Sequence, residues 1–248
     1  MRRNADELEK MRKAGKVVGE MHARIREAIR PGVTTFELDR IGRDVIDRNG
    51  ARSNFLGYGY PPFPAVICAS PNSVIVHGIP DETVLEEGDI ISVDCGAIIQ
   101  GYHGDAAFTA PVGTVSAEAE KLIRVTEESL WAGIKQMVDG NRISDIGHAV
   151  QNVAEGAGFS VVREYVGHAI GTAMHEKPEV PNYGDPGKGP KLRPGNVFAV
   201  EPMVNMGTPG TRLLADQWTV VTADGALSAH FEHTIAITDN GPEVLTVT

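Results

Sequence analysis

A repeat within the chain constrains its fold more than any other feature of the sequence. Leu85–Asp94 aligns with Leu192–Glu201, with Leu, Gly and Val at matching positions and a carboxylate at the end of each copy. The offset is 107 residues, and residues 32–38 match residues 140–146 at an offset of 108. Because helical and strand segments repeat together, we predict an α/β (α+β) fold built from two halves related by a pseudo-twofold axis.

The repeat also predicts how the chain is divided. We expect residues 1–248 to form a single catalytic domain made of two related halves, about 30–110 and 139–238, rather than two independent domains. An amphipathic helix is expected before the first half, because apolar residues from Leu8 to Ile29 recur at alternating spacings of three and four. The carboxylates that end the two copies are then expected to meet near the axis.

Hydrophobic periodicity and turn residues predict the other elements. Residues 53–64 are rich in Gly, Pro and aromatic residues and predict a loop, as do residues 178–194. Thr34 and Glu37 form a capping-box pattern that opens a helix ending near residue 49. Further helices are expected over 116–138 and 144–157, and strands near 65–69, 74–76, 90–98, 103–110, 159–168, 196–204, 217–222 and 231–238.

Four carboxylates and a histidine lie within or beside apolar, strand-like segments. A buried carboxylate is unfavourable unless it is paired, protonated or bound to a metal. Together these side chains supply an oxygen-rich donor set with one imidazole, which suits two hard or borderline divalent ions. The sequence therefore predicts a metal-dependent hydrolase whose candidate ligands are Asp94, Asp105, His168, Glu201 and Glu232.

Asp94 and Asp105 are expected to share one face of a hairpin. If the strands on either side of residues 99–102 pair, Asp94 is opposite residue 107 and Asp105 is opposite residue 96. The two carboxylates are then diagonal neighbours, about 7–8 Å apart. Either aspartate alone fits a turn or a salt bridge, but two unpaired carboxylates would repel each other, which favours a cation between them.

Two further histidines are candidates for the chemistry. Gly167 and Gly171 argue against a continuous helix, so His175 is expected in the loop that follows the strand of His168. A histidine beside a metal site is a usual means of stabilising an oxyanion. His77 lies at a strand-to-turn step, where a structural role is an equally good interpretation. The remaining histidines are assigned structural roles: His22, His103, His148, His230 and His233.

Charge and composition exclude several classes of protein. The net charge is −10, with about +4 on residues 1–30 and about −14 on the rest. An acidic body argues against a nucleic-acid substrate, and the basic N-terminal helix is more typical of a solvated face than of a binding site. Cys68 and Cys95 form no disulfide framework, and no apolar stretch reaches the roughly 18 residues of a membrane span. We expect a cytoplasmic protein.

Seven short motifs lie along the chain: Val76–Pro80, Val93–Gly96, Gly104-Asp105, Gly167–Gly171, His175-Glu176, Val200–Pro202 and Phe231–Thr234. They occur in the order and context of the methionine aminopeptidases, which the chain resembles from about residue 3 to residue 245. The resemblance implies the pita-bread fold, whose duplicated halves agree with the repeat. The chain looks like the type I branch in its short bacterial form, because only 25 residues separate His175 from Glu201 and no N-terminal extension precedes the similar region.

The resemblance implies a role for each candidate ligand. Asp94 would chelate one divalent ion, and His168 and Glu201 would hold the other. Asp105 and Glu232 would bridge both ions. These donors accept Mn, Fe(II), Co and Zn, and they do not select one of them.

The resemblance also implies catalytic and substrate-binding residues. Glu201 would carry a proton towards the leaving amine, His175 would polarise the scissile carbonyl, and His77 would hold the adjoining amide or backbone. The methionine pocket would be formed by apolar, sulfur-tolerant walls, although core packing is the alternative role for each aromatic residue. The pocket residues are Phe55, Tyr58, Phe63, Cys68 and Trp218.

The chain departs from the family pattern at two places. Met174 stands where an aromatic residue is common, which would soften one wall of the pocket. The loop at residues 55–63 is longer than in close relatives, which affects the assignment of its aromatic residues. A monovalent-cation site of the family is implied at the backbone of Asn72, Val74 and Ser228.

We therefore predict removal of the N-terminal methionine from nascent polypeptides whose second residue is small. The alternative is a proline-specific peptidase of the same fold, which usually carries a large additional N-terminal domain. A non-catalytic binding protein would be expected to lose ligands, and all five are present. The expected partners are nascent N-termini and, transiently through the basic helix, the ribosome. We expect no membrane or direct nucleic-acid substrate, and a monomer.

Overall fold

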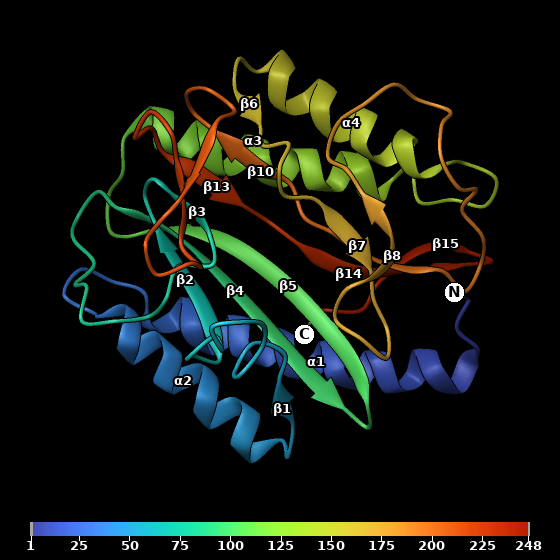
Figure 1. Ribbon diagram of the computed structural model, residues 1–248, viewed down its shortest axis with the longest axis horizontal. Helices are drawn as coiled ribbons and strands as arrows, with labels where there is room; N and C mark the ends of the chain where they lie inside the picture. The colour runs from blue at the N-terminus through green and yellow to red at the C-terminus, as the bar shows by residue number, and fades with distance from the viewer. Residues whose placement is uncertain (1, 248) are drawn as a thin grey trace.

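The computed structural model describes residues 2–247. Its helices occur in two pairs, one before and one after a long β-hairpin (Figure 1). The capping box predicted at the start of the second helix is confirmed, because the Thr34 hydroxyl accepts from the Glu37 N–H and the Glu37 carboxylate accepts from the Thr34 N–H. The helices are α1 Ala5–Ala28, α2 Thr35–Arg48, α3 Ala117–Ile134 and α4 Ile143–Gly156.

The strands fall into two groups separated by the second helix pair. Those before it are β1 Arg52–Ser53, β2 Ile67–Pro71, β3 Val74–Val76, β4 Ile90–Ile99 and β5 Tyr102–Pro111. Those after it are β6 Ser160–Val161, β7 Gly167–Ala169, β8 Glu176–Val180, β9 Val197–Val200, β10 Met203–Asn205, β11 Thr211–Leu213, β12 Val220–Thr222, β13 Ser228–His230, β14 His233–Thr238 and β15 Gly241–Val244.

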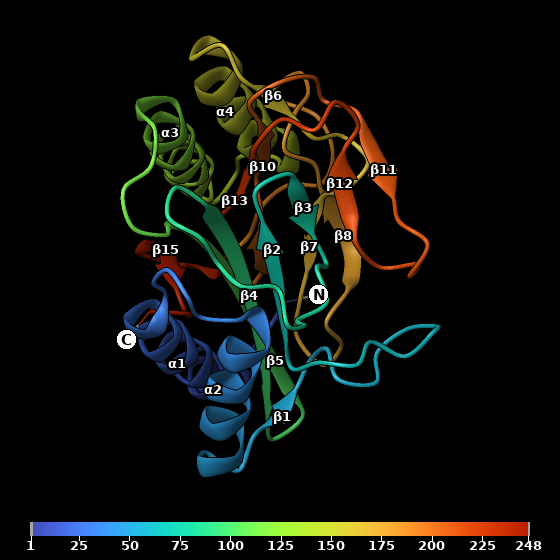
Figure 2. The same ribbon diagram turned by 90° about the vertical axis from the view of Figure 1, so that its left-hand side faces the viewer.

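Two larger sheets and two small ones are formed within the described residues. The first large sheet has the order β1-β4-β2, with β5 on the other edge of β4, and the second has the order β15-β14-β9-β7-β8. The small sheets are β13-β10-β6 and β11-β12-β3, so the latter contains a strand from each group. Figure 2 shows α1, α2 and α3 on one side of the β4–β5 hairpin, with β11 and β12 on the other.

A short seam joins the two large sheets where the candidate ligands lie. Ala107 of β5 and Glu232, just before β14, exchange backbone hydrogen bonds with N···O distances of 3.2 and 2.9 Å. The Asp105 N–H also donates to the Thr234 hydroxyl at 3.0 Å, and that hydroxyl donates back to the Asp105 carbonyl at 2.8 Å. The backbone therefore holds Asp105 next to Glu232 without any bond to either carboxylate.

The β4–β5 hairpin has the predicted register. Asp94 is opposite Ala107 and Asp105 is opposite Gly96, so the two aspartates are diagonal neighbours on one face. A Cβ on Gly96 would collide with the side chain of Asn54, so this position requires glycine. The amide of Asn54 donates to the Gly104 carbonyl at 3.0 Å and supports the strand on the side of Asp105.

Several predicted element limits are wrong. The strand predicted over 159–168 is two separate strands, β6 and β7, and the strand predicted over 196–204 breaks between β9 and β10 at Glu201-Pro202. Proline has no N–H to donate to a ladder, which explains this break. The strand predicted over 217–222 begins only at Val220, and α3 ends at Ile134 rather than near residue 138.

Five short strands were not predicted, and two of the five lie partly in predicted loops. β8 covers part of the predicted 178–194 loop and β1 includes the first residue of the predicted 53–64 loop, while β11, β13 and β15 have no counterpart in the prediction. These strands are two to five residues long, and all except the buried β13 are largely exposed or half-buried. A strand of this kind has too few buried positions to show the alternation of apolar and polar residues that identifies a strand.

One hydrophobic core connects both groups of elements. It includes Val93 and Phe108 from the β4–β5 hairpin, Val200 and Ile235 from the second large sheet, and Ile25 of α1. No helix within residues 2–247 is both long enough and apolar enough to cross a membrane. The division into two related halves remains a prediction.

Candidate functional site

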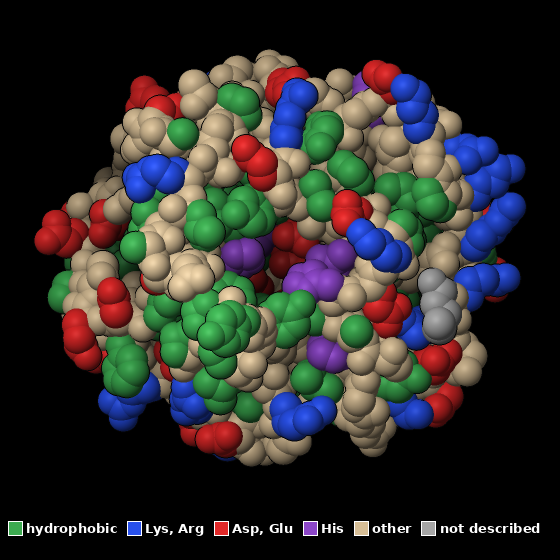
Figure 3. Space-filling model, in the orientation of Figure 1, with side chains coloured by type: hydrophobic (Ala, Val, Ile, Leu, Met, Phe, Trp, Pro, Cys, Tyr) green, Lys and Arg blue, Asp and Glu red, His purple; other side chains and the backbone are tan. Residues whose placement is uncertain are grey.

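A cleft of about 120 Å³ opens near the centre of one face, where acidic and histidine side chains show at its base (Figure 3). All five predicted metal ligands line it, together with His77, His175 and the five predicted pocket residues. Met174, noted as a departure from the family pattern, also lies in its wall. The lining residues are Phe55, Tyr58, Phe63, Cys68, His77, Asp94, Asp105, His168, Met174, His175, Glu201, Trp218 and Glu232.

Each candidate ligand comes from a strand or from the residue next to one. Asp94 and Asp105 lie on β4 and β5, and His168 is the middle residue of β7. Glu201 follows the last residue of β9, and Glu232 precedes β14. Because the ligands sit on hydrogen-bonded strands from both large sheets, the backbone fixes their separation.

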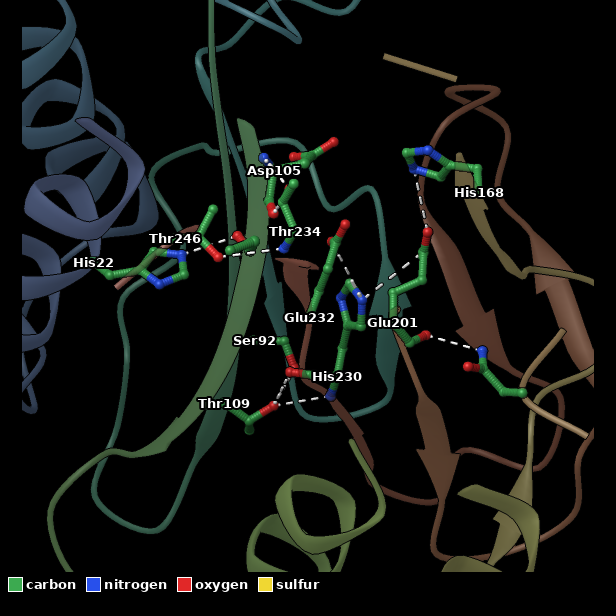
Figure 4. A network of polar contacts seen from close by, with 12 residues as sticks. His22, Ser92, Asp105, Thr109, His168, Glu201, His230, Glu232, Thr234 and Thr246 are labelled. Carbon is green, nitrogen blue, oxygen red and sulfur yellow. Dashed lines mark hydrogen bonds and ion pairs between the residues drawn. The ribbon is translucent and has the colours of Figure 1, made fainter. Parts of the chain in front are cut away.

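The donor atoms of four of these residues, all except Asp94, fall in two groups that could hold a metal ion. One group that could hold a metal ion consists of Asp105, His168 and Glu232, and a second consists of Glu201, His230 and Glu232; within each, the donor atoms lie within 4.8 Å of one another. His168 Nε2 is 3.4 Å from Glu201 Oε1 (Figure 4). The two groups share Glu232, which is the arrangement that a bridging carboxylate requires.

Burial makes the charged form of every carboxylate in this cluster unfavourable. It raises the pKa of Asp94 to about 8. Burial and the charge of Asp94 raise the pKa values of Asp105 and Glu201 well above their usual range. Burial and the charge of Asp105 do the same for Glu232. Without a cation, these groups therefore bind protons at a pH where exposed carboxylates are ionised.

Unpaired oxygen atoms show that the cluster fits a divalent cation. Asp94 Oδ1, Asp105 Oδ1 and Glu232 Oε1 are buried and have no hydrogen-bond partner among the described residues. A buried polar atom left without a partner costs roughly 1–3 kcal/mol, and more if it is charged. Divalent ions bind carboxylate oxygens and imidazole nitrogens, so bound ions would satisfy all three atoms and offset the repulsion among the carboxylates.

His168 is held in the neutral form, with one ring nitrogen able to bind a metal. His168 Nδ1 lies 3.1 Å from the carbonyl oxygen of Ala169 and therefore carries the proton, which leaves Nε2, the nitrogen nearest Glu201, with a free lone pair. Burial and the neighbouring His175 lower the pKa of His168 to about 3. A neutral imidazole is the form that binds metals.

His175 and His77 lie on the side of the cleft near its aromatic wall. The His175 ring is 4.3 Å from the His168 ring, between centroids, and its Nδ1 is 2.8 Å from the Tyr58 hydroxyl. His77 has a φ of 59°, an uncommon backbone conformation for a residue other than glycine. Burial lowers the pKa of His77 to about 4, so both a proton-accepting and a proton-donating nitrogen are present on the ring.

Beside the carboxylates lies an apolar pocket. Phe55, Phe63, Cys68 and Met174 are buried in one cluster against which Trp218 packs. The rings of Phe63 and Trp218 meet edge to face at 5.3 Å, and the Trp218 indole N–H donates to the Pro61 carbonyl at 2.9 Å. Trp218 lies in the turn before β12, not in a strand. The pocket therefore offers thioether and aromatic surface next to the carboxylates.

Two residues that the sequence analysis did not assign to the site also lie there. His230, interpreted as structural, has its Nε2 4.0 Å from Glu201 and 3.9 Å from Glu232 (Figure 4). That nitrogen has no hydrogen-bond partner among the described residues. The buried Asn182 donates to the Glu201 backbone carbonyl at 3.0 Å. Asn182 lies in a loop without a distinctive pattern. His230 lies two residues before Glu232, and this spacing places both side chains on one face of an extended segment, so it was a local signal that could have been used.

The residues predicted around a monovalent cation lie together but apart from the cleft lining. The Ser228 N–H donates to the Asn72 carbonyl at 2.9 Å, and Asn72 has a φ of 53°. The side chain of Asn72 is engaged by Asp89 and by the Ile90 N–H, and the Ser228 hydroxyl contacts Asn205. The side chains of Asn72 and Ser228 thus have protein partners, and the cation site stays a prediction.

Comparison with known proteins identifies the family. The sequence pattern of metallopeptidase family M24 matches residues 9–239. The methionine aminopeptidase of Clostridium acetobutylicum is 55% identical over 246 residues, which is 99% of this chain and 98% of that protein. The crystal structure of methionine aminopeptidase from Thermotoga maritima matches with a TM-score of 0.96 at 43% identity, and the match covers 100% of both chains.

The same fold occurs in a proline-specific enzyme at much lower similarity. The prolidase from Pyrococcus furiosus matches with a TM-score of 0.79 at 20% identity, over 100% of this chain and 65% of that one. This likeness concerns the fold alone, and it confirms the predicted pita-bread architecture together with the Thermotoga structure. The chain belongs to metallopeptidase family M24 and, within that family, to the methionine aminopeptidases.

Proposed function

We propose that this protein removes the N-terminal methionine from polypeptides whose second residue is small. The observation that carries the proposal is the adjacency, in one cleft, of a carboxylate and histidine cluster and an apolar pocket lined by Met174, Cys68 and aromatic rings. The pocket suits an unbranched thioether side chain, and the cluster suits hydrolysis of the bond next to it. The 55% identity to a methionine aminopeptidase supports the same activity.

The cluster is proposed to hold two divalent ions, drawn from Mn, Fe(II), Co and Zn. Asp94 would bind one ion, His168 and Glu201 the other, and Asp105 and Glu232 both. Bound ions would supply a water acidic enough at neutral pH to attack the first peptide carbonyl. His230, which the sequence-based assignment did not include, has its Nε2 4.0 Å from Glu201 and 3.9 Å from Glu232, beyond hydrogen-bond distance of either carboxylate.

The residues around the cluster would orient the substrate and move its protons. Glu201 is proposed to take a proton from the attacking water and to pass it to the leaving amine, because its carboxylate lines the cleft beside the other candidate ligands. His175 would donate a hydrogen bond to the scissile carbonyl oxygen as charge develops there, and His77 would hold the adjoining amide. The apolar pocket would exclude charged first residues, which would have no partner inside it.

Peptide selectivity tests this proposal. We expect release of methionine from Met-Ala-Ser at least about tenfold faster than from Met-Lys-Ser, because the loop at residues 55–63 and the segment with Met174 and His175 wall the cleft and a bulky second residue would contact them. Metal would be stripped and restored before the assay, and free methionine would be measured. Equal cleavage of both peptides, or a preference for Xaa-Pro bonds whatever Xaa is, would favour the proline-specific alternative instead.

The contact between Tyr58 and His175 leads to a second prediction. If the Tyr58 hydroxyl donates to His175 Nδ1, the proton of the neutral ring stays on Nε2, which is then the nitrogen able to donate to a substrate. Tyr58→Phe keeps the aromatic wall but removes this hydroxyl. We expect kcat on Met-Ala-Ser to fall by about tenfold, the lower end of what loss of an orienting hydrogen bond costs, with KM nearly unchanged.

Tyr60→Phe is the matched control for that variant. Tyr60 lies in the same loop, and its side chain is 94% exposed, so the loss of its hydroxyl should leave kcat unchanged. If Tyr58→Phe raises KM and leaves kcat alone, Tyr58 serves as a pocket wall and does not set the tautomer of His175.

The cellular setting is proposed from the same relationship. We infer a cytoplasmic enzyme that acts as a monomer on nascent polypeptide N-termini and contacts the ribosome transiently. The ribosome contact is inferred from the basic character of α1. Two of its basic residues form ion pairs within the protein, Lys10 with Asp6 and Arg12 with Glu243. Cosedimentation of the protein with ribosomes at low and high salt would test this contact.

A further inference from the structure

A buried ion pair connects the segment before α1 to the loop that carries His175. The side chain of Arg3 is only 2% exposed, and its Nη2 contacts Glu176 Oε2, whose side chain is 16% exposed. The two residues are 173 positions apart in the sequence. Glu176 directly follows His175 in the sequence, and the side chain of His175 lines the cleft.

Glu176 uses its other carboxylate oxygen to hold the rest of that loop. Oε1 accepts from the N–H of Thr172 at 2.9 Å and from the N–H of Ala173 at 3.3 Å. The guanidinium of Arg3 lies directly against Gly171, where any Cβ would collide with it. Arg3 and Glu176 therefore form the centre of the loop between β7 and β8, and the loop folds around them.

The backbone of Arg3 is fixed by the segment just before β9. Its N–H donates to the Gly195 carbonyl at 2.7 Å. Gly195 has a φ of 88°, and a Cβ there would lie 2.8 Å from the Arg3 carbonyl oxygen. Gly195 lies two residues before β9, the strand that ends at Glu201. Arg3 thus bridges the His175 loop and the start of the strand that leads to Glu201.

We propose that Arg3 is a positioning residue for the reaction, which acts by holding the 171–176 loop so that His175 and Met174 face the cleft. This inference rests on the proposed function of His175. Removing Arg3 would leave the Glu176 carboxylate largely buried without its cation, and the loop would move to expose it. A displacement of about 1 Å of a group that contacts the reacting atoms costs up to about a hundredfold in rate.

The test compares Arg3→Ala with two matched variants. Arg3→Ala is expected to lower kcat on Met-Ala-Ser by between about tenfold and a hundredfold. Arg3→Lys keeps the charge but loses the planar fork, so it should recover part of that loss. Arg2→Ala is the control, because Arg2 is exposed and binds only a carbonyl of the same neighbouring segment; its kcat and KM should match those of wild type.

A double-mutant cycle separates positioning from general destabilisation. If Arg3 acts through His175, Arg3→Ala should cost less than about twofold when His175 is already alanine, because interacting residues are not additive. The proposal would be overturned if the fold-losses in kcat of the two single variants multiply in the double variant. It would also be overturned if folded Arg3→Ala has the kcat and KM of wild type. If Arg3→Ala does not fold, Glu176→Gln replaces it in the same cycle. Methionine release by wild type in the same assay tests the proposed function separately from the role of Arg3.

Discussion

Replacing Glu201 with glutamine will lower turnover of Met-Ala-Ser by at least about a hundredfold, the minimum expected for loss of an acid–base group, while the protein stays folded. Glutamine has nearly the shape of glutamate, but it cannot accept the proton of the attacking water. It also removes one negative charge from a cluster in which His168 Nε2 lies 3.4 Å from Glu201 Oε1. The hydrogen bond from the Asn182 side-chain amide to the Glu201 backbone carbonyl is unaffected, so we expect the local fold to be kept.

Glu128→Gln is the control for this variant. It makes the same chemical change on the exposed surface of α3, where Glu128 pairs with Arg124. A surface pair of this kind contributes about 0–1 kcal/mol, so both activity and unfolding temperature should match those of wild type. Turnover by Glu201→Gln above about a hundredth of the wild-type rate would remove Glu201 from the proposed proton transfer.

The geometry of the aspartate pair was predictable because a hairpin has little freedom. Once the strands around residues 99–102 pair, the register follows from the count of residues, and it sets Asp94 opposite Ala107. The two-residue period of a strand then requires Asp94 and Asp105 to share a face. Local rules and an obligatory pairing were sufficient here, and no long-range information was needed.

The break of the long predicted strand at Glu201 could also have been predicted. Pro202 directly follows Glu201, and proline is poorly tolerated inside a paired strand. β9 and β10 are both fully buried, so apolar residues lie on both sides of the break. Their hydrophobicity alone therefore predicts one continuous strand. The consequence matters for the site: the chain turns at Glu201, so this carboxylate lies at a strand end.

Arg3 could not be predicted in the same way, and His230 only in part. His230 lies two residues before Glu232, which is the period that places two side chains on one face of a strand. Its position in the site also depends on the pairing of β13 with β10 and on the Thr109 hydroxyl, which bonds to both the N–H and the carbonyl of His230. Arg3 reaches the His175 loop across 173 residues of sequence, and it belongs to no periodic pattern that would reveal it.

Replacing Asp105 with asparagine will abolish the stabilisation of the protein by divalent metal without weakening the metal-free fold. Asp105 is 4% exposed, and burial together with the charges of Asp94 and Glu201 raises its pKa well above the usual range. Its neutral form is therefore already preferred in the absence of a cation, and asparagine is a neutral side chain of the same shape. We expect the metal-free unfolding temperature to stay constant or to rise.

The additional stability that bound metal gives the protein should, in contrast, be lost in Asp105→Asn. An ion at about a hundred times its dissociation constant stabilises a folded protein by about 2.7 kcal/mol, which for a chain of this size is a rise of about 5–10 °C. Thermal unfolding with and without Mn²⁺ should show such a rise for wild type and almost none for Asp105→Asn. Methionine release by the variant should fall by at least about a hundredfold, because Asp105 is proposed to bind both ions.

Asp39→Asn provides the contrast that makes this result specific. Asp39 is as buried as Asp105, at 2% exposed, but its oxygens are satisfied: they accept from the Val66 N–H at 2.8 Å and from Arg43 at 3.2 Å. Asp39→Asn should therefore lower the metal-free unfolding temperature and keep the rise on adding Mn²⁺. The two substitutions should thus have opposite effects on the metal-free unfolding temperature and on the rise with Mn²⁺. The oxygens of Asp39 are paired within the protein, whereas Asp105 Oδ1 has no partner among the described residues. If Asp105→Asn instead destabilises the metal-free protein and keeps the rise, Asp105 is a structural residue and the cation is held elsewhere.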